Sequence, residues 1–186
     1  LTTLFSTDDT KKNEDFSEKT IAELVRACFE MGKVKTGALI VIERGTPLGE
    51  IERTGIEVDG IVTSQLLINI FEHNTPLHDG AVVIRGNRVT AATCYLPLSD
   101  NMDISKALGT RHRAAVGVSE ATDSVTLVVS EETGRVSVAV SGRLKSVKDG
   151  DELRDILSVL VKRETENTGR FRIWKGRRRN ERKADE

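Results

Sequence analysis

Two short segments of the chain carry the side chains best suited to phosphate and metal chemistry. The first, Thr110-Arg111-His112-Arg113, stands where a helix is expected to begin. Positive side chains in the first helical turn oppose the helix dipole at a cost of up to about 1 kcal/mol, which a bound anion would offset. The backbone N–H groups, the Thr110 hydroxyl and two guanidinium groups could together bind a polyphosphate. A solvated basic turn, paired with nearby carboxylates, is the competing interpretation.

The second segment, His78-Asp79-Gly80, stands at the start of a predicted strand. A carboxylate next to an imidazole can hold a divalent cation or accept a proton from a hydroxyl group. Strand ends on a rigid sheet are also common positions for reactive groups. Against this, Asp-Gly is a common turn dipeptide and a lone histidine is usually structural.

A third candidate, Ser130-Glu131-Glu132, follows another predicted strand. Its position at a strand end resembles that of the second segment. A polar hairpin turn explains the same residues equally well.

Apolar periodicity predicts the helices that position these segments. The expected helices run from an N-cap at Ser17 to Gly32, over residues 64–71 and 103–108, from a cap at Thr110 through Val118, and from Asp149 or Asp151 through Val161.

The expected strands cover residues 38–43, a short piece at 56–58, a hairpin of 81–85 with 88–96, and a hairpin of 125–130 with 135–141. The rest of residues 44–62 is expected to form connections, and residues 171–174 an edge strand or a docked segment.

This order of helices and hairpins predicts an α/β fold, a single domain with a mixed central β-sheet flanked by helices. The continuous apolar run at residues 38–42 predicts a strand that is covered on both faces. We expect a flexible lead-in over residues 1–16, a single folded domain over 17–168, and a basic, disordered tail over 169–186.

Composition limits the class of protein. The chain has 186 residues, of which 38% are hydrophobic and 31% charged, typical of a soluble domain. Its net charge is -1, but residues 170–186 hold 8 basic and 3 acidic groups. Nucleic-acid binding through this tail is not expected, because the acidic body would repel a polyanion. Cys28 and Cys94, without metal-ligand spacing, are expected to be buried reduced thiols.

Three motifs, in this order, resemble those of the diadenylate cyclase (DAC) domain: Leu77-His78-Asp79-Gly80-Ala81, Gly109-Thr110-Arg111-His112-Arg113-Ala114-Ala115 and Val129-Ser130-Glu131-Glu132-Thr133-Gly134. The similarity covers about residues 18–165. The chain most resembles the membrane-anchored class, so we expect a cytoplasmic domain that follows transmembrane helices in the full-length protein.

The resemblance implies that two ATP molecules condense to cyclic di-AMP and two pyrophosphates, in a face-to-face homodimer that holds one ATP per subunit. It implies catalysis by Asp79, Arg111, His112 and Arg113, and a Mn²⁺ or Mg²⁺ ion held by His78, Asp79 and Glu132, although either Glu131 or Glu132 could be the ligand. The implied nucleotide-binding residues are Gly80, Ala81, Gly109, Thr110, Arg111, His112, Arg113, Ser130 and Glu131, with Tyr95, Leu96, Gly37 and Ala38 around the adenine.

The resemblance also implies a regulatory protein and an enzyme of cell-wall precursor synthesis as partners. A non-catalytic sensor that binds an adenine nucleotide is the alternative function. Pyrophosphate release from ATP with a divalent metal separates the two.

Overall fold

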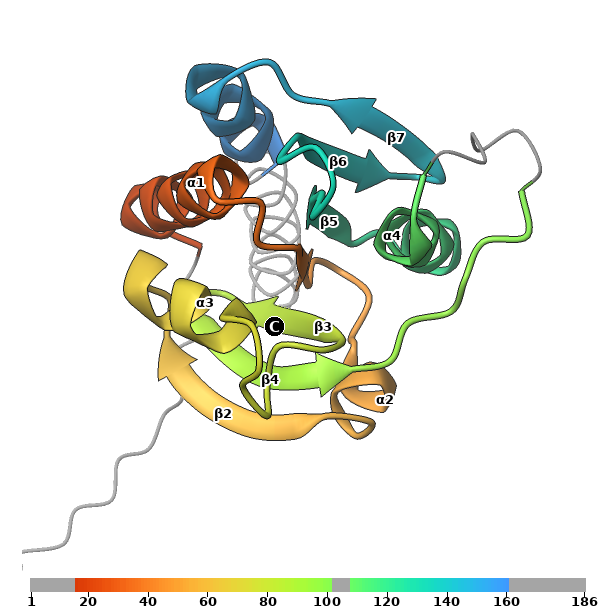
Figure 1. The fold of residues 1–186 in the computed structure, drawn as a ribbon. Coiled ribbons are helices and arrows are strands. Elements are labelled where there is room, and N and C mark those ends of the chain that lie inside the picture. Colours follow the sequence, from red (N-terminus) through yellow and green to blue (C-terminus); the bar gives the residue numbers. More distant parts are fainter. Residues whose placement is uncertain (1–15, 102–107, 161–186) are drawn as a thin grey trace, which may run out of the picture.

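The computed structural model describes residues 16–101 and 108–160, and Figure 1 shows their arrangement. The helix expected over residues 103–108 lies outside the described residues except for Leu108. The lead-in, apart from Phe16, the segment 171–174 and the basic tail lie outside them too.

A seven-stranded sheet with the order β2-β4-β3-β1-β5-β6-β7 forms the centre of the molecule. Strands β1 and β3 are parallel, and every other pair is antiparallel, so the predicted mixed sheet is confirmed. The strands are β1 (Ala38–Ile42), β2 (Ile56–Ile61), β3 (Ala81–Arg85), β4 (Arg88–Cys94), β5 (Val125–Val129), β6 (Val136–Val140) and β7 (Arg143–Ser146).

Helices cover both faces of this sheet, as Figure 1 shows. Helices α1 (Glu18–Lys33) and α3 (Ser64–Phe71) and the helical segment 150–160 pack on one face. Helix α4 (Thr110–Ala121) packs on the other, and the short α2 (Gly49–Glu52) lies against β4. None of the described helices has the length and apolar character needed to cross a bilayer.

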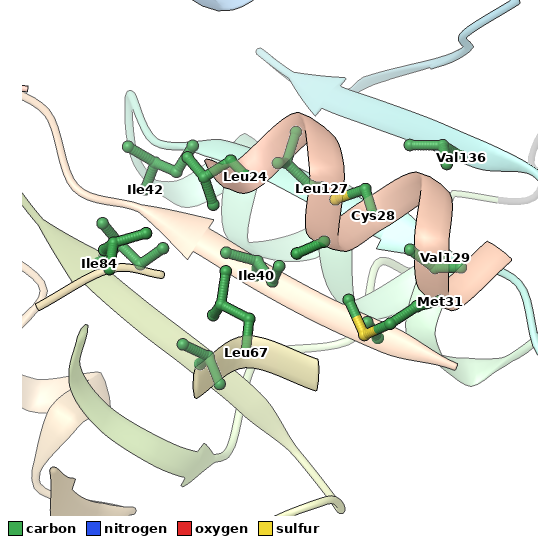
Figure 2. Close-up of a cluster of buried hydrophobic side chains, with 14 of the residues drawn as sticks. Leu24, Cys28, Met31, Ile40, Ile42, Leu67, Ile84, Leu127, Val129 and Val136 are labelled. Carbon is green, nitrogen blue, oxygen red and sulfur yellow. The ribbon is translucent and has the colours of Figure 1, made fainter. Parts of the chain in front are cut away.

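The larger core lies between α1, α3 and the sheet (Figure 2). Leu24 and Met31 of α1 and Leu67 of α3 are at most 1% exposed there. Burying each such side chain contributes about 1.5–3 kcal/mol. Strand β1 sends Ile40 into this core and Leu39 into the core under α4. The strand is therefore covered on both faces, as its continuous apolar run predicts.

Both cysteines are free and buried, which confirms the prediction of reduced thiols. Burial raises the pKa of the Cys28 thiol to about 12. The pKa of Cys94 rises to about 11, mainly through burial and also through the nearby carboxylate of Glu52. Neither thiol is therefore ionised at neutral pH.

The predicted N-cap of α1 is confirmed, because Ser17 Oγ accepts a hydrogen bond of 3.2 Å from the N–H of Thr20. The predicted end at Gly32 is wrong by one residue, since α1 continues to Lys33. Gly32 instead permits a close backbone approach, because a Cβ atom there would lie 2.5 Å from the carbonyl oxygen of Gly134.

The sequence predicts Thr110 as the N-cap of α4, but Thr110 is the first helical residue. The cap is Gly109, which has no side chain to close the first turn. Two elements were not predicted, α2 and β7, and β2 runs to Ile61 rather than ending at residue 58. Strand β4 ends at Cys94, two residues before the predicted end.

Candidate functional site

An open cavity of about 1090 Å³ collects residues from all three candidate segments. Its lining includes Asp79 and Gly80 before β3, residues 109–112 at the start of α4, and residues 130–132 after β5. The volume suits a ligand of nucleotide size. Three segments that are far apart along the chain therefore form one site.

Strand directions explain why these segments meet. Residue Val82 of β3 lies beside Ile40 in the parallel pair, and Val129 of β5 lies beside Ala38 in the antiparallel pair. The start of β3, the start of β1 and the end of β5 therefore share one edge of the sheet. The end of β4 joins them, since Cys94 pairs with Ala81.

Arg111 and Glu131 form an ion pair across the cavity lining, with 2.8 Å between Nη1 and Oε2. Their side chains are 25% and 62% exposed, so water reaches the carboxylate more than the guanidinium. The competing interpretation, a basic turn paired with a carboxylate, thus holds for Arg111, which nevertheless lines the cavity.

Gly37, which the resemblance predicts beside the adenine, lies against this guanidinium. A Cβ atom at Gly37 would be 2.8 Å from Cζ of Arg111. Gly37 is absent from the cavity lining. In the described structure its lack of a side chain leaves space for the guanidinium of Arg111.

His112 is a buried imidazole at the start of α4, with 7% of its surface exposed. Burial lowers the pKa of His112, Glu132 opposes this shift and Arg111 adds to it. The ring is consequently neutral at pH 7, and can donate one N–H hydrogen bond to an anion in the cavity.

Gly80 holds Asp79 at the cavity through a close backbone contact. Its φ is +103°, and a Cβ atom there would lie 2.8 Å from the carbonyl carbon of Thr93. Thr93 itself has φ +56°, which is rare for a β-branched residue. The register of β3 and β4 is irregular beside this contact. β-Bulges are common beside functional sites, where they change the direction of a strand and of its side chains.

The wall near Tyr95 depends on a threonine that the sequence analysis missed. Tyr95 N–H donates to Thr54 Oγ1 over 2.9 Å, and the Thr54 hydroxyl donates to the carbonyl of Ile51 over 2.6 Å. Thr54, Tyr95 and Leu96 all line the cavity. No motif marks Thr54 in the sequence, because its position depends on α2.

Five of the predicted site residues do not line the cavity: His78, Ala81, Arg113, Gly37 and Ala38. Ala38 and Ala81 are fully buried, so they support the site from beneath. The structure adds Arg135, Ser137 and Ser146 to the lining. Strand alternation carries a signal for Ser137, since it lies two residues before Ala139, which packs toward α4.

The predicted metal ligands are only partly assembled. Among the described residues, no group of three or more histidine, cysteine or acidic side chains lies close enough to hold a metal ion. Asp79 and Glu132 both line the cavity, and carboxylate oxygens suit Mg²⁺ or Mn²⁺. His78 lies outside the lining, where its Nδ1 is 2.6 Å from the carbonyl oxygen of Thr75.

A family model described as DAC, DisA bacterial checkpoint controller nucleotide-binding, matches residues 25–144. The chain belongs to this DAC family. The match covers β1 to β6 and all three segments at the cavity, and of the residues that line the cavity only Ser146 lies beyond it.

Curated relatives of this DAC domain share about half of its aligned residues. The chain is 50% identical over 166 residues to cyclic di-AMP synthase CdaA of Bacillus subtilis, which covers 89% of the chain and 61% of the relative. It is 51% identical over 157 residues to a diadenylate cyclase of Listeria monocytogenes, which covers 84% and 58%. The chain thus spans about three-fifths of the length of these relatives.

Two solved structures share the fold. A double mutant of DacA from Staphylococcus aureus matches with a TM-score of 0.74 and 48% identity, over 76% of this chain and 94% of that one. A hypothetical membrane spanning protein from Bacillus cereus matches with a TM-score of 0.68 and 42% identity, over 70% and 64%. The mixed sheet of this DAC domain is therefore a fold known from experiment.

Proposed function

We propose that this DAC domain is a diadenylate cyclase, which condenses two ATP molecules into cyclic di-AMP and two pyrophosphates. One observation carries the proposal: a single cavity joins the carboxylate of Asp79 to the cationic start of α4 and to the turn after β5. The names of the curated relatives, cyclic di-AMP synthase and diadenylate cyclase, support the same reaction.

In this proposal the start of α4 binds the triphosphate. Thr110 offers a hydroxyl, Arg111 a guanidinium and His112 a ring N–H, and Ser130 adds a hydroxyl from the turn after β5. Charge-assisted hydrogen bonds to phosphate are roughly twice as strong as neutral ones. Arg113 is the second cation of the segment, and it reaches the phosphates only after its side chain turns into the cavity.

In this proposal Tyr95 and Leu96 enclose the adenine. Both side chains line it, and an aromatic ring can stack on a purine. The nucleotide then lies along the sheet edge, with its sugar near Asp79.

Asp79 acts as the base in this mechanism. Its carboxylate accepts the proton of a ribose 3′ hydroxyl, whose oxygen forms a bond to the α-phosphorus of the facing ATP. The bond from that phosphorus to the bridging oxygen breaks, and pyrophosphate leaves with the electron pair. Orientation of the nucleotides and neutralisation of their charge by Arg111 supply most of the rate in phosphate transfer of this kind.

The donor set at the cavity fits a divalent cation. Asp79 and Glu132 would hold Mn²⁺ or Mg²⁺ together with phosphate oxygens of ATP, and His78 would join them after turning toward the cavity. When bound, such a cation neutralises phosphate charge and increases the acidity of the hydroxyl group. Of the two adjacent glutamates, Glu131 is paired with Arg111, which favours Glu132 as the ligand.

Two copies of the domain face each other in the active assembly. Each chain contributes one set of site residues, while the product needs two nucleotides. Tyr95, Leu98 and Ile56 line the cavity and are 77%, 53% and 52% exposed. Such apolar groups at the rim of a polar site suit burial against a second copy.

The proposal places the domain on the cytoplasmic side of a membrane, in a protein that carries its own anchor. Support comes from the membrane-anchored class that the motifs resemble, and from the Bacillus cereus relative described as membrane spanning. A regulatory protein and an enzyme of cell-wall precursor synthesis are the proposed partners.

Product analysis tests the proposed function. The protein is incubated with ATP and either Mg²⁺ or Mn²⁺, and nucleotides and pyrophosphate are quantified by chromatography and mass spectrometry. Cyclic di-AMP with two equivalents of pyrophosphate is expected. ATP binding without pyrophosphate release under every metal would refute catalysis and favour the nucleotide sensor.

A further inference from the structure

The loop between α3 and β3 brings together two of the three histidines of the chain. The ring centroids of His73 and His78 are 5.5 Å apart, and the ring planes are inclined by 62°. Asn74 takes a left-handed φ of +64°, which turns the chain back between them. The described structure thus places two imidazoles edge to face, outside the lining of the main cavity.

This loop is anchored by its own hydrogen bonds. The Thr75 hydroxyl donates to the carbonyl of Ile70 over 3.2 Å, and the Thr75 N–H donates to the carbonyl of Glu72 over 3.3 Å. The carbonyl of Thr75 in turn lies 2.6 Å from Nδ1 of His78. The backbone therefore holds the His78 ring from one side.

The contact with Thr75 determines the tautomer of His78. A carbonyl oxygen only accepts hydrogen bonds, so Nδ1 carries a proton, and in the neutral ring Nε2 then has the lone pair. Histidine ligands of metal ions commonly show this arrangement, with the second ring nitrogen donating to a backbone carbonyl. His78 is thereby prepared to coordinate a metal through Nε2.

The spacing of the two rings fits a shared metal ion. A zinc–nitrogen bond of about 2.0–2.1 Å places each ring centre roughly 3.2 Å from the ion. Two imidazoles at a tetrahedral angle then have centres about 5.2 Å apart. The observed 5.5 Å is close to this value, and His73 is exposed, so its ring can rotate to direct a nitrogen at the ion.

We propose that His73 and His78 form a two-imidazole site for a late first-row transition metal such as Zn²⁺, Ni²⁺ or Cu²⁺. Imidazole nitrogens favour these ions, whereas Mg²⁺ prefers oxygen ligands. No third histidine, cysteine or acidic group completes a cluster among the described residues, so water fills the remaining positions. The site therefore binds metal reversibly and in exchange with solvent.

This site shares His78 with the proposed catalytic cation site but differs from it in its second ligand and in its ion. It requires His73, which no part of the proposed reaction uses, and it forms without nucleotide. Because His78 belongs to both, a bound Zn²⁺ would keep His78 turned toward His73 and away from Asp79. The two sites should consequently compete when both metals are present.

Calorimetry on the nucleotide-free protein tests the site. One Zn²⁺ per chain is expected to bind, with an affinity at least tenfold above that of Mg²⁺. His73→Gln and His78→Gln should each weaken Zn²⁺ binding at least tenfold. His112→Gln is the matched control, because it removes the remaining histidine, which is buried elsewhere, and it should leave Zn²⁺ affinity unchanged.

A spectroscopic measurement counts the imidazole ligands of the bound metal. Electron paramagnetic resonance of the Cu²⁺ complex should show coupling to two imidazole nitrogens in the unmodified protein, and to one in His73→Gln. Unchanged coupling or unchanged Zn²⁺ affinity in His73→Gln would overturn the site. Equal loss in His112→Gln would also overturn it. Neither result depends on whether the protein makes cyclic di-AMP.

Discussion

Arg111 Nη1 lies 2.8 Å from Glu131 Oε2, which joins the first turn of α4 to the turn between β5 and β6. Both residues line the cavity in which the proposed function places a triphosphate. A cation at a helix start is unfavourable without an anion, and Glu131 is that anion in the absence of phosphate. Phosphate binding to Arg111 must therefore replace the carboxylate or share the guanidinium with it.

Glu131→Gln is expected to strengthen ATP binding. The variant keeps the size of the side chain but removes the charge that competes with phosphate for Arg111. A partly exposed ion pair contributes roughly 0.2–1 kcal/mol, so the dissociation constant should fall by up to about fivefold. Calorimetry with a non-hydrolysable ATP analogue measures this change.

A double-mutant cycle provides the control. Arg111→Ala alone should weaken ATP binding by about 1.5–3 kcal/mol, the contribution of a charge-assisted contact. If Glu131 acts through Arg111, adding Glu131→Gln to Arg111→Ala should give no further gain. An equal gain in both backgrounds would mean that Glu131 acts on the phosphates by general repulsion instead.

Two glycine substitutions should separate a site effect from a folding effect. At Gly37 a Cβ atom meets the mobile end of Arg111, so Gly37→Ala should move the guanidinium and lower ATP affinity with little loss of stability. At Gly134, with φ +74°, a Cβ atom overlaps the carbonyl oxygen of Gly32. Gly134→Ala should lower the free energy of unfolding by about 1–3 kcal/mol or more.

Thermal and urea unfolding, alongside ATP titrations, check this pair. A Gly37→Ala protein with lost stability and normal ATP affinity would contradict the assignment of Gly37 to Arg111.

Much of the fold was predictable because local signals and tertiary packing agree. Helix α3 has the predicted bounds, and both predicted hairpins form. The missed elements carry weak local signals. Helix α2 has only four residues and no buried side chain, and β7 is an edge strand of four mainly exposed residues. Elements of this kind form through contacts with neighbouring elements, and their own sequences carry no clear apolar pattern.

The motifs predict residues that the structure brings to one cavity, whereas residues that only the tertiary structure brings there carry no signal in the sequence. The motif residues Asp79, Arg111 and Ser130 line the cavity as expected. Thr54 carries no signal, because it reaches Tyr95 from a connection 41 positions earlier in the sequence. Gly37 was assigned to the adenine by resemblance, and only the described contacts place it against Arg111.

Thr54→Val should weaken the binding of the adenine beside Tyr95 and should leave the contacts to the phosphates of ATP unchanged. The variant keeps the shape of the side chain but removes the acceptor for the Tyr95 N–H, at a cost of about 0.5–1.5 kcal/mol. We expect KM for ATP to rise several-fold with kcat nearly unchanged. Thr54→Ser restores a hydroxyl and should restore KM, while an equal defect in both variants would argue against this hydrogen bond.

His112 should make stability depend on pH in the weakly acidic range. Burial lowers the pKa of His112 below its ordinary value of 6.5, so just below pH 6.5 the unfolded chain binds more protons than the folded one. Stability should therefore fall as pH falls through this range and be fully present above it. His112→Gln should flatten the dependence between pH 7 and 5 in urea unfolding, and an unchanged slope would exclude His112 as its source.

Asp79→Asn tests both the base and the need for two subunits. The amide keeps the shape of the side chain but cannot accept the proton of the hydroxyl group. Homodimers of the variant should bind ATP and form no product. Mixed dimers of wild-type and variant chains, crosslinked to prevent exchange, should give a different result because only one of their two hydroxyl groups can be activated.

In such a mixed dimer, the ATP of the wild-type subunit attacks the α-phosphorus of the ATP held by the variant, and one pyrophosphate leaves. The second attack requires the missing carboxylate, so the linear dinucleotide should accumulate with one triphosphate retained. Crosslinked wild-type dimers control for the effect of crosslinking and should release cyclic di-AMP. Abundant cyclic product from the mixed dimer would mean that one Asp79 serves both bonds, or that another group acts as the base.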